Sequence, residues 1–363
     1  MKKLKLKNVL FRITVLLLAL VFAIFAPKLE FNAGDDLKYI YGSFIGQKSP
    51  YNGMLEVWNI DSFESGLKSK FSYLESMAKK FQKRYKGVYL MLRNLTIGEC
   101  VNLLNEGTVP DVISCSYGVS EKIKRYVKAF ETNDVMLFDN FLEAGKGDDN
   151  KIYGLAWCAG FYFLISTKSK LEKAGIDFET AQLNKVAYEA EYEYKIGKKT
   201  KNSKSLVFGT NEYLMPKNAL KAYNKARSIQ IQENESNELR LKSQYSAYTS
   251  FLSNDATILL GTHRDVFKMQ AREESGKVSD VAYLPLTNWT DLVQFSFLLK
   301  NEDKKRSEMA ERFALFLTET KNQEELEKIG LFSVTKIEKG FYKGVMRDIT
   351  PEKISVCELK KVI

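Results

Sequence analysis

The sequence predicts an α/β fold of two lobes, each a sheet covered by helices. The first observation is length, because a chain of 363 residues exceeds the roughly 250–300 residues at which a single core stops growing. The second is composition, since 45% of the residues are apolar and 12% are aromatic, enough to fill two cores. The third is order: strand-like and helix-like segments alternate along the chain, as a parallel sheet with crossover helices requires.

The elements of the first lobe follow from periodicity. Residues 53–58 form a short apolar strand, residues 63–85 carry apolar side chains at helical spacing, and residues 88–92 form a second strand. A helix at residues 97–104 then leads into a third strand at residues 111–114. Ligands meet open α/β sheets at the carboxyl ends of the strands, so polar residues that follow these strands are candidates for a site.

A second cycle of strands and helices begins at residues 151–157. It continues with an apolar strand at residues 161–165 and a helix from about Ser169. Residues 184–204 are rich in Lys, Tyr and Glu and predict a surface excursion, part helix and part loop. The remaining expected elements are strands at residues 256–260, 278–284 and 292–299, a helix at about residues 264–272, and two helices between residues 306 and 328.

The N-terminus predicts an export signal, because a basic start precedes an apolar run from Ile13 to Ala26. A run of about 14 residues is short for a spanning helix, which needs roughly 17, although Val9 to Phe11 extend it if Arg12 snorkels. Pro27 disfavours cleavage after Ala26, and no Cys follows to accept a lipid. Residues 1–30 are therefore a signal peptide or a retained membrane anchor, with the anchor favoured.

Either fate places the remaining chain at the extracellular face of the cytoplasmic membrane, anchored or secreted. Residues 31–52 mix Gly, Asp, Lys, Ser and Pro with scattered aromatics and have no sustained period. We expect them to form a stalk between the N-terminal segment and the folded body.

Charge and cysteine content exclude several classes of function. The formal net charge is +10, and the N-terminal segment supplies half of it through Lys2, Lys3, Lys5, Lys7 and Arg12. The later basic residues are interleaved with acidic ones, so no basic face for nucleic acid is expected. The four cysteines form no CxxC pair, which argues against zinc and dithiol sites. Cys115 and Cys158 lie in apolar contexts that predict buried side chains.

Catalytic motifs are also missing. The chain has one histidine, which leaves little room for a histidine-based triad or a multi-histidine metal site. It contains no GxSxG, GxxxxGK[ST] or HExxH sequence. We therefore expect no catalytic residue, no cofactor and no bound metal.

An ordered series of segments resembles a known family. Residues 54–58 (MLEVW) precede a long helix, residues 106–111 (EGTVPD) precede an apolar strand, and residues 153–157 (YGLAW) run into residues 161–165 (FYFLI). The C-terminal half continues with residues 251–264, 281–286 and 313–323. From residue 53 to about 335 this order is similar to the family 1 extracellular solute-binding proteins, the maltose-binding-protein-like subunits of ATP-binding cassette sugar importers. The lipidated Cys that usually follows the signal in that family is absent here.

The resemblance implies a type II periplasmic-binding-protein-like fold with a ligand cleft between two lobes. It implies chain crossings near residues 157–160, 283–286 and 300–310. Lobe one is then residues 53–157 plus 286–305, and lobe two is residues 158–285 plus 306–363. The implied partners are a carbohydrate or another small solute and the permease of an importer, with the chain itself a monomer that closes by hinge motion.

A sugar site needs aromatic planes and paired hydrogen-bond donors and acceptors. Residues of these types follow the predicted strands and crossings. The candidate ligand-binding residues are Asp61, Ser62, Ser116, Tyr117, Trp157, Asn211, Tyr213, His263, Arg264, Trp289 and Asp291.

Several of these candidates keep a structural alternative. Asp61 and Ser62 bind ligand or cap the following helix. Trp157 stacks on a sugar or packs the hinge, with stacking favoured. His263 is a cleft hydrogen-bonder or a polar residue at a helix N-terminus. Arg264 pairs with Asp265 across the lobes, binds ligand hydroxyls, or forms a surface pair worth at most about 1 kcal/mol.

Two other functions remain open beside solute capture. A secreted glycoside-active enzyme needs only a suitable pair of carboxylates. A cell-surface interaction module derived from a binding protein would have lost its ligand and would recruit a protein. An aromatic-lined cleft favours transport, whereas a filled cleft favours the interaction module. Within the transport function, a peptide, a polyamine or a metal ion are alternatives to the sugar.

Overall fold

The computed structural model describes most of the chain after residue 50. It describes residues 51–363 except 133–134, 176–177, 179–190, 197–198, 210, 212, 227–242, 338–341, 343 and 362–363, with only the backbone described for residues 191–205. The predicted signal or anchor and nearly all of the predicted stalk lie outside these residues. The chain divides into one unit of Met1–Asn52 with Tyr85–Val88 and a second of Gly53–Arg84 with Tyr89–Ile363. The second unit holds both sheets. None of the described helices is both long and apolar enough to cross a membrane.

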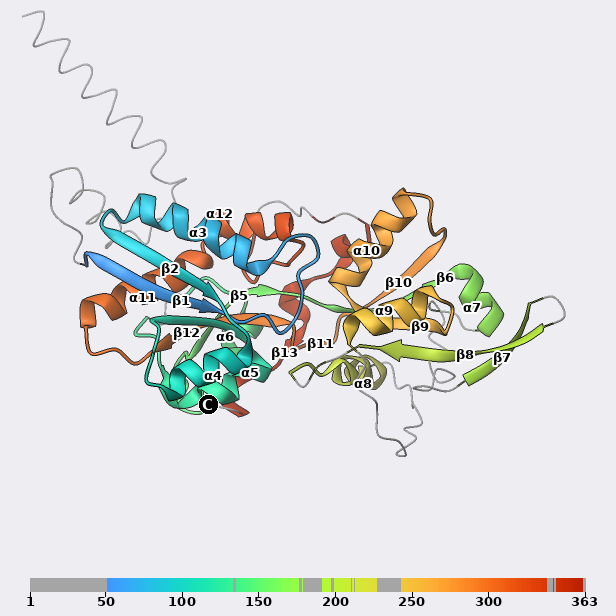
Figure 1. Cartoon of the computed structure of the whole chain (residues 1–363), viewed down its shortest axis with the longest axis horizontal. Helices are drawn as coiled ribbons and strands as arrows, with labels where there is room; N and C mark the ends of the chain where they lie inside the picture. The colour runs from blue at the N-terminus through green and yellow to red at the C-terminus, as the bar shows by residue number, and fades with distance from the viewer. Residues whose placement is uncertain are drawn as a thin grey trace, which may run out of the picture. The chain divides into compact units, whose positions relative to one another are not determined.

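The first lobe is built on a six-stranded sheet with the order β2-β1-β3-β12-β4, in which β5 also pairs with β12 (Figure 1). β1 runs parallel to β3, but β12 runs antiparallel to both β3 and β5. The sheet is therefore mixed, whereas the sequence predicts a parallel one. Its strands are β1 (Gly53–Asn59), β2 (Val88–Asn94), β3 (Val112–Ser116), β4 (Val127–Lys128), β5 (Gly154–Ala159) and β12 (Val293–Leu299).

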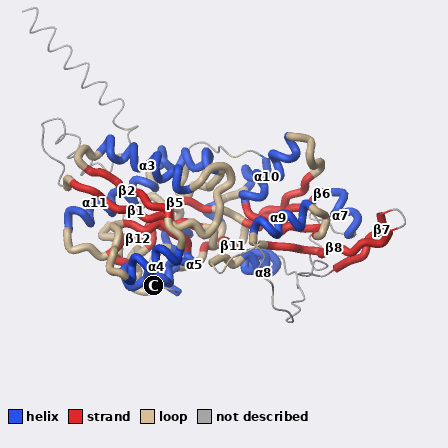
Figure 2. The backbone as a smooth tube through the Cα atoms, in the orientation of Figure 1, coloured by secondary structure: helices blue, strands red, loops and turns tan. Residues whose placement is uncertain are grey.

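Helices pack against this sheet (Figure 2). α11 contacts α3, β1, β5 and β12, while α5 contacts β3 and β12. The ring of Phe81 on α3 meets Phe313 and Phe316 of α11 edge to face, which holds these two helices together. The helices are α3 (Lys70–Arg84), α4 (Ile97–Asn105), α5 (Tyr117–Ile123), α6 (Asp139–Ala144), α11 (Lys304–Leu317) and α12 (Thr320–Gln323).

The second lobe is built on a five-stranded sheet with the order β10-β6-β9-β8-β7. β8 and β9 are parallel, and the other pairs are antiparallel. The strands are β6 (Tyr162–Thr167), β7 (Glu191–Ile196), β8 (Lys199–Phe208), β9 (Ala256–Thr262) and β10 (Val281–Leu286). The helices are α7 (Lys168–Ala174), α8 (Pro216–Ala226), α9 (Gln244–Leu252) and α10 (His263–Glu274).

The polar segment at residues 184–204 differs from the expected mixture of helix and loop where the structure describes it. Where the sequence predicts part helix and part loop, β7 and β8 form an antiparallel hairpin that pairs Glu191 with Lys204. The run Glu-Tyr-Glu-Tyr-Lys at residues 191–195 alternates in residue type, and alternation with aromatic residues is typical of a strand.

Short elements complete the fold. β11 (Trp289–Thr290) runs parallel to β13 (Ser355–Val356). Five short 3₁₀ segments are described: Lys124–Tyr126, Glu324–Ile329, Gly344–Asp348, Pro351–Lys353 and Leu359–Lys361. The segment Gly344–Asp348 contacts β10 of the second lobe, so the C-terminal part of the chain touches both lobes.

The chain passes between the lobes at two places close to those expected. Residues 160–161 join β5 to β6, and residues 287–292 lead from β10 to β12. The third expected crossing, near residues 300–310, is not seen, because β12 and α11 both belong to the first lobe. The exact lobe boundaries stay a prediction, but the placement of α11 in lobe two does not fit this packing.

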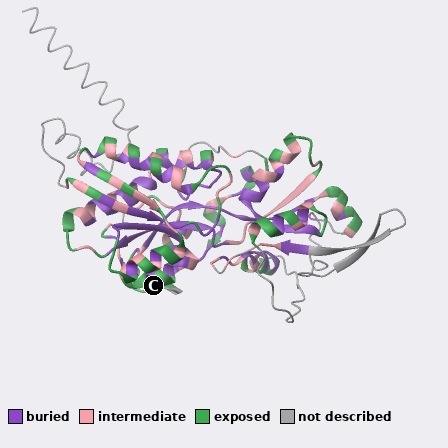
Figure 3. Ribbon diagram, in the orientation of Figure 1, coloured by how far each residue is buried: buried purple, intermediate pink, exposed green. Residues whose placement is uncertain are grey.

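Apolar strands form the core of each lobe. Every residue of β3, β5, β9 and β12 is buried, and Figure 3 shows β5 and β12 in the colour of buried residues. All four cysteines are buried, as the sequence predicts for Cys115 and Cys158. Burial of consecutive residues means that both faces of these strands are covered.

Candidate functional site

Polar side chains from the two lobes meet where β1 and β3 end. The hydroxyl groups of Ser62, after β1, and Ser116, at the end of β3, are hydrogen-bonded to each other and buried. From the second lobe, Asn211 donates from Nδ2 to the backbone oxygen of Ser62 at 2.8 Å. Its Oδ1 accepts from the backbone N–H of Tyr213 at 2.9 Å. These four predicted site residues are therefore brought together.

The backbones also approach closely at this place. A Cβ atom built on Gly118, in the first turn of α5, would lie 2.3 Å from the backbone oxygen of Tyr213. No other residue type fits there without movement of one lobe's backbone. Tyr117, next to Gly118, is half-buried, and burial raises the pKa of its hydroxyl. We call this meeting of residues 60–69, 116–118, 211, 213–215 and 263–265 the interlobe junction.

Arg264 forms an ionic contact between the two lobes at the interlobe junction. Its Nε donates to Oε2 of Glu64 in the first lobe at 2.6 Å, and its Nη1 donates to Oδ1 of Asp265 at 2.8 Å. The Arg264 side chain is 4% exposed, while that of Glu64 is 59% exposed. Asp265 also caps α10 by accepting from the backbone N–H of Thr262 at 2.9 Å. Arg264 pairs with its neighbour Asp265 as a buried pair within the second lobe, rather than across the lobes or at the surface, and its partner across the lobes is Glu64.

His263 is buried and belongs to the packing of the first crossing. Its ring Nδ1 accepts from the backbone N–H of Phe161 at 3.3 Å, and the backbone N–H of His263 donates to the backbone oxygen of Phe161 at 2.9 Å. Burial, and then the charge of Lys70, lower the pKa of the imidazole to about 3. The ring packs so tightly on Gly160 that a Cβ there would lie 2.2 Å from it. Of the two expectations, the structural one fits this geometry.

Asp61 neither caps a helix nor joins the serine pair. The following helix, α3, begins at Lys70, seven residues later than expected. Lys70 is buried, and its ammonium group pairs with Asp61 at 3.1 Å and lies 3.7 Å from the centre of the Phe63 ring. The segment between them turns at Gly66, where a Cβ would meet the Phe267 ring of α10 at 2.1 Å. Packing against the second lobe therefore displaces the helix start.

The expectation that Trp157 stacks on a ligand is wrong for this structure. The side chain is fully buried, and its indole lies parallel to the Tyr73 ring with the ring centres 5.3 Å apart. Its Nε1–H donates to the Ser114 hydroxyl at 3.1 Å. Both ring and N–H are thus engaged within the first lobe. Trp289 on β11 is half-buried and stays a predicted stacking residue.

Asp291 is a buried link rather than an open ligand contact. Its carboxylate accepts from the Tyr162 hydroxyl at 2.8 Å and from the backbone N–H of Met215 at 2.6 Å. Burial raises the pKa of Asp291 to about 6, against the lowering effect of these hydrogen bonds. The residue ties the second crossing to β6 and to the chain before α8.

A buried polar network that the sequence analysis did not identify lies in the first lobe, next to the interlobe junction. Gln294 on β12 donates from Nε2 to the backbone oxygen of Ile60 and to the Ser114 hydroxyl, each at 3.1 Å, and lies 3.4 Å from Oδ1 of Asn59. A glutamine inside the apolar run VQFSFLL is the one signal that indicates such a residue. Glu64 has no comparable signal, because its partner Arg264 is 200 residues away in the sequence.

In the part of the chain that the structure describes, no group of three or more His, Cys, Asp and Glu side chains is placed to hold a metal ion. The polar groups described at the interlobe junction include hydroxyl, amide, carboxylate and guanidinium groups. Such groups exchange hydrogen bonds with polar, uncharged molecules.

The fold is that of the two-lobed, periplasmic-binding-protein-like α/β class. No protein-family model and no curated protein matches the chain, so the likeness is to solved structures. A sugar transporter structure from Rhizobium etli, in an open conformation, has 15% identity and a TM-score of 0.54, covering 84% of this chain and 89% of that one. A putative oligosaccharide periplasmic-binding protein from Synechococcus, in complex with zinc, has 12% identity and a TM-score of 0.52, covering 77% and 78%. Iron-bound HitA from Pseudomonas aeruginosa has 13% identity and a TM-score of 0.50, covering 83% and 94%.

These neighbours confirm the two-lobed fold that the ordered segments resemble. Their names differ in ligand, since two refer to sugars or oligosaccharides and the third to iron. At such identities the fold is shared, and the ligand has to be argued from this chain's own residues.

Proposed function

We propose that this chain is the extracytoplasmic substrate-binding component of an ATP-binding cassette importer, capturing a small solute by closure of its two lobes. One observation carries the proposal: polar side chains from both lobes face each other at the carboxyl ends of β1 and β3, with Asn211 on Ser62 and Arg264 on Glu64. When the lobes separate, the Asn211–Ser62 hydrogen bond and the Arg264–Glu64 ion pair break. A solute between the lobes would then satisfy their donors and acceptors, and closure would follow its binding.

A mono- or oligosaccharide is the solute class that fits these groups best. Sugar hydroxyls donate and accept together, which matches the hydroxyl, amide and carboxylate groups of Ser62, Ser116, Asn211 and Glu64. Half-buried rings that could cover C–H faces are Tyr117, Tyr213 and Trp289. A peptide, a polyamine or a metal ion would need a different set of side chains. Two of the structural neighbours named above are described as sugar or oligosaccharide proteins.

The remaining partners follow from this role. The solute would be delivered to a membrane permease, and the N-terminal apolar segment would hold the chain at the extracellular face of the cytoplasmic membrane or direct its secretion. A monomer with one site per chain suffices for such delivery. No catalytic step is included in the proposal.

One observation favours a second candidate, a cell-surface interaction module. The interlobe junction is filled by its own side chains, because Arg264, Asn211 and the two serines all bond to protein groups. A binding protein that had lost its ligand would keep the lobes together in this way. The two candidates differ in whether a sugar changes the protein.

A thermal-shift screen of the full-length chain against mono- and oligosaccharides separates them, with peptides, polyamines and metal ions as controls. Saturable stabilisation by one sugar class, without product on long incubation, supports solute capture; a ligand at a hundredfold excess over its Kd stabilises the native state by about 2.7 kcal/mol. Asn211→Ala should weaken that binding, and Asn218→Ala, at an exposed position on α8, should not. The absence of a shift from every carbohydrate would favour the interaction module, and conversion of the sugar would indicate an enzyme.

A further inference from the structure

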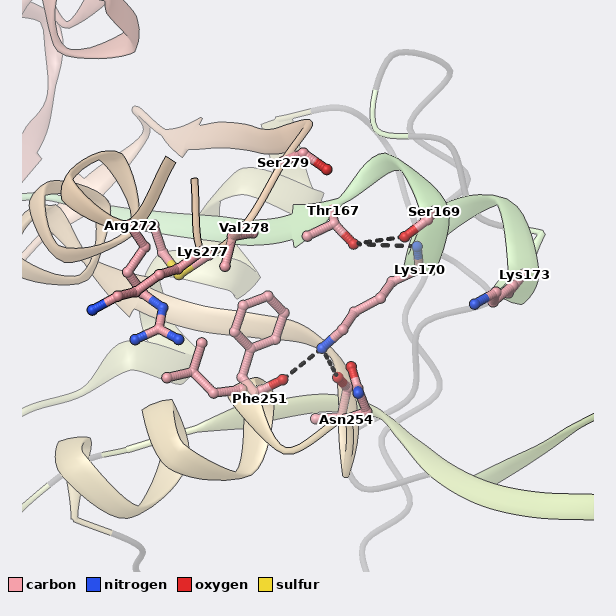
Figure 4. A pocket seen from close by; sticks show the side chains of 13 residues that line it. Thr167, Ser169, Lys170, Lys173, Phe251, Asn254, Arg272, Lys277, Val278 and Ser279 are labelled. Carbon is pink, nitrogen blue, oxygen red and sulfur yellow. Dashed lines mark hydrogen bonds between the residues drawn. The ribbon is translucent and has the colours of Figure 1, made fainter. Parts of the chain in front are cut away.

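A separate pocket lies in the second lobe, away from the interlobe junction. It has a volume of about 340 Å³, is open on one side, and is lined by residues of α7, the end of α9, α10 and residues 277–279 (Figure 4). β9 connects the two places, since Ala256 at its start lines the pocket and Thr262 at its end caps α10. The seven-residue strand β9 places its two ends about 20 Å apart. The pocket is therefore separate from the interlobe junction.

Four cationic side chains line this pocket: Lys170, Lys173, Arg272 and Lys277. No Asp or Glu is among its lining residues, and in the described part of the chain none of the four cations has an acidic group within ion-pair distance. Figure 4 shows Lys170 reaching from α7 towards Phe251 and Asn254, with Arg272 and Lys277 on the opposite wall. Asp255 is the one acidic group that acts on Lys170 in the described part of the chain, and it does so from beyond ion-pair distance. Four cations facing one pocket favour an anion there.

Two of these cations are partly removed from water. The ammonium group of Lys170 donates to the backbone oxygens of Phe251 at 2.5 Å and Ala256 at 3.1 Å. Its burial lowers its pKa to about 8, which shows that the surroundings disfavour its charge. The Nε–H of Arg272 is buried and has no hydrogen-bond partner. An unsatisfied buried donor on a charged group is costly, and an anionic acceptor in the pocket would satisfy it.

The rest of the lining suits a small molecule that carries the anion. The hydroxyl groups of Thr167, Ser169 and Ser279 add polar groups, and Phe251, Val278 and Met269 add apolar surface. A volume of about 340 Å³ lies at the lower end of the roughly 300–1,000 Å³ typical of small-molecule sites.

We propose that this pocket binds a phosphate group, either free phosphate or the phosphate of a small organic ester, between Lys170 on one wall and Arg272 and Lys277 on the other. The tetrahedral oxyanion offers several strong acceptors, which suits an Arg Nε–H and two ammonium groups. Hydroxyl groups of the lining complete the polar contacts, and the apolar surface accommodates the carbon part of an ester. The site does not depend on the solute that binds between the lobes.

Calorimetric titration of the full-length chain tests this at constant ionic strength. The probes are inorganic phosphate, glycerol 3-phosphate and uncharged glycerol. Saturable binding of a phosphate probe is expected, with the Kd raised at least tenfold in Lys170→Gln and in Arg272→Gln. Lys305→Gln, which removes an exposed lysine of α11 in the other lobe, is the matched control and should bind as the wild type does.

The two phosphate probes distinguish an organic ester from the free ion. Tighter binding of glycerol 3-phosphate than of phosphate identifies an ester, and the reverse identifies the free ion. The proposal is overturned if neither phosphate probe binds saturably, or if all variants bind with the same Kd. Should Lys170→Gln fail to fold, Arg272→Gln and Lys277→Gln carry the test, because neither side chain is fully buried.

Discussion

Arg264, at the start of α10, donates from Nε to the Glu64 carboxylate at 2.6 Å across 200 residues of sequence. The contact joins the second lobe to the loop that follows β1 in the first. It is asymmetric, because the Arg264 side chain is buried and the Glu64 side chain is largely exposed. The asymmetry determines how each partner responds to mutation.

Glu64→Ala should change the free energy of unfolding by no more than about 1 kcal/mol, since an exposed carboxylate contributes little to stability. Arg264→Ala should cost roughly 3–5 kcal/mol, because it leaves the buried Asp265 carboxylate without its cation. Urea denaturation measures both, with Glu302→Ala, at an exposed loop position, as the control. Equal effects of the two mutations would contradict the asymmetry.

Trp157→Ala should destabilise the protein by roughly 3–5 kcal/mol, because it removes a fully buried side chain that stacks on Tyr73. Trp289→Ala, at a half-buried position, should cost less and should weaken binding of any solute that occupies the interlobe junction. Chemical denaturation and solute titration of both variants make the comparison. A stable Trp157→Ala protein with selectively weakened solute binding would restore Trp157 as a ligand contact.

Gly118→Ala should destabilise the closed junction by roughly 1–3 kcal/mol, since the new methyl group would lie 2.3 Å from the backbone oxygen of Tyr213. Gly98→Ala is the matched control, because a Cβ there meets nothing within 4 Å and the residue lies in α4. It should stabilise the protein by about 0.5–1 kcal/mol. Thermal unfolding of both variants measures these changes in stability. Equal destabilisation by Gly118→Ala and Gly98→Ala would contradict the close approach of Gly118 to Tyr213.

His263 should stay neutral down to about pH 4, because its pKa in the folded protein is lowered to about 3. It is the only histidine in the chain, so its ring signals in an NMR titration need no assignment by mutation. A depressed pKa contributes stability that is complete above the unfolded value near 6.5 and is lost at about 1.4 kcal/mol per pH unit as the pH falls from there towards 3. A titration midpoint near pH 6 would show that the ring reaches solvent.

Asp291 should produce the opposite pH dependence. Its pKa in the folded protein is raised to about 6, above the unfolded value of about 3.9. Its contribution is therefore complete below pH 3.9 and is lost as the pH rises through 6, by about 3 kcal/mol in all. Relative to Asp291→Asn, the wild type should lose stability between pH 4 and pH 7. The exposed Asp348→Asn should show no such difference, and a flat difference for Asp291→Asn would refute the raised pKa.

Strand and helix positions could be predicted from the sequence because their signals are local. The apolar strands β1, β2, β3, β9 and β12 lie within a few residues of their expected positions, since side-chain alternation and apolar runs depend on neighbouring residues only. The same holds for the placement of Ser62, Ser116, Asn211 and Tyr213 after strands, which the fold then brings together.

Tertiary structure alone decided strand direction, burial and distant partners. β12 runs antiparallel to its neighbours because the chain re-enters the first sheet from the second lobe, and no local pattern records that path. Trp157 is buried because Tyr73, Ser114 and β12 surround it, although its sequence neighbours are small and polar enough to suggest a cleft. Glu64 finds Arg264 only after folding. The sequence by itself thus determined the elements and the two-lobed class, whereas long-range packing determined which side chains are available for a ligand.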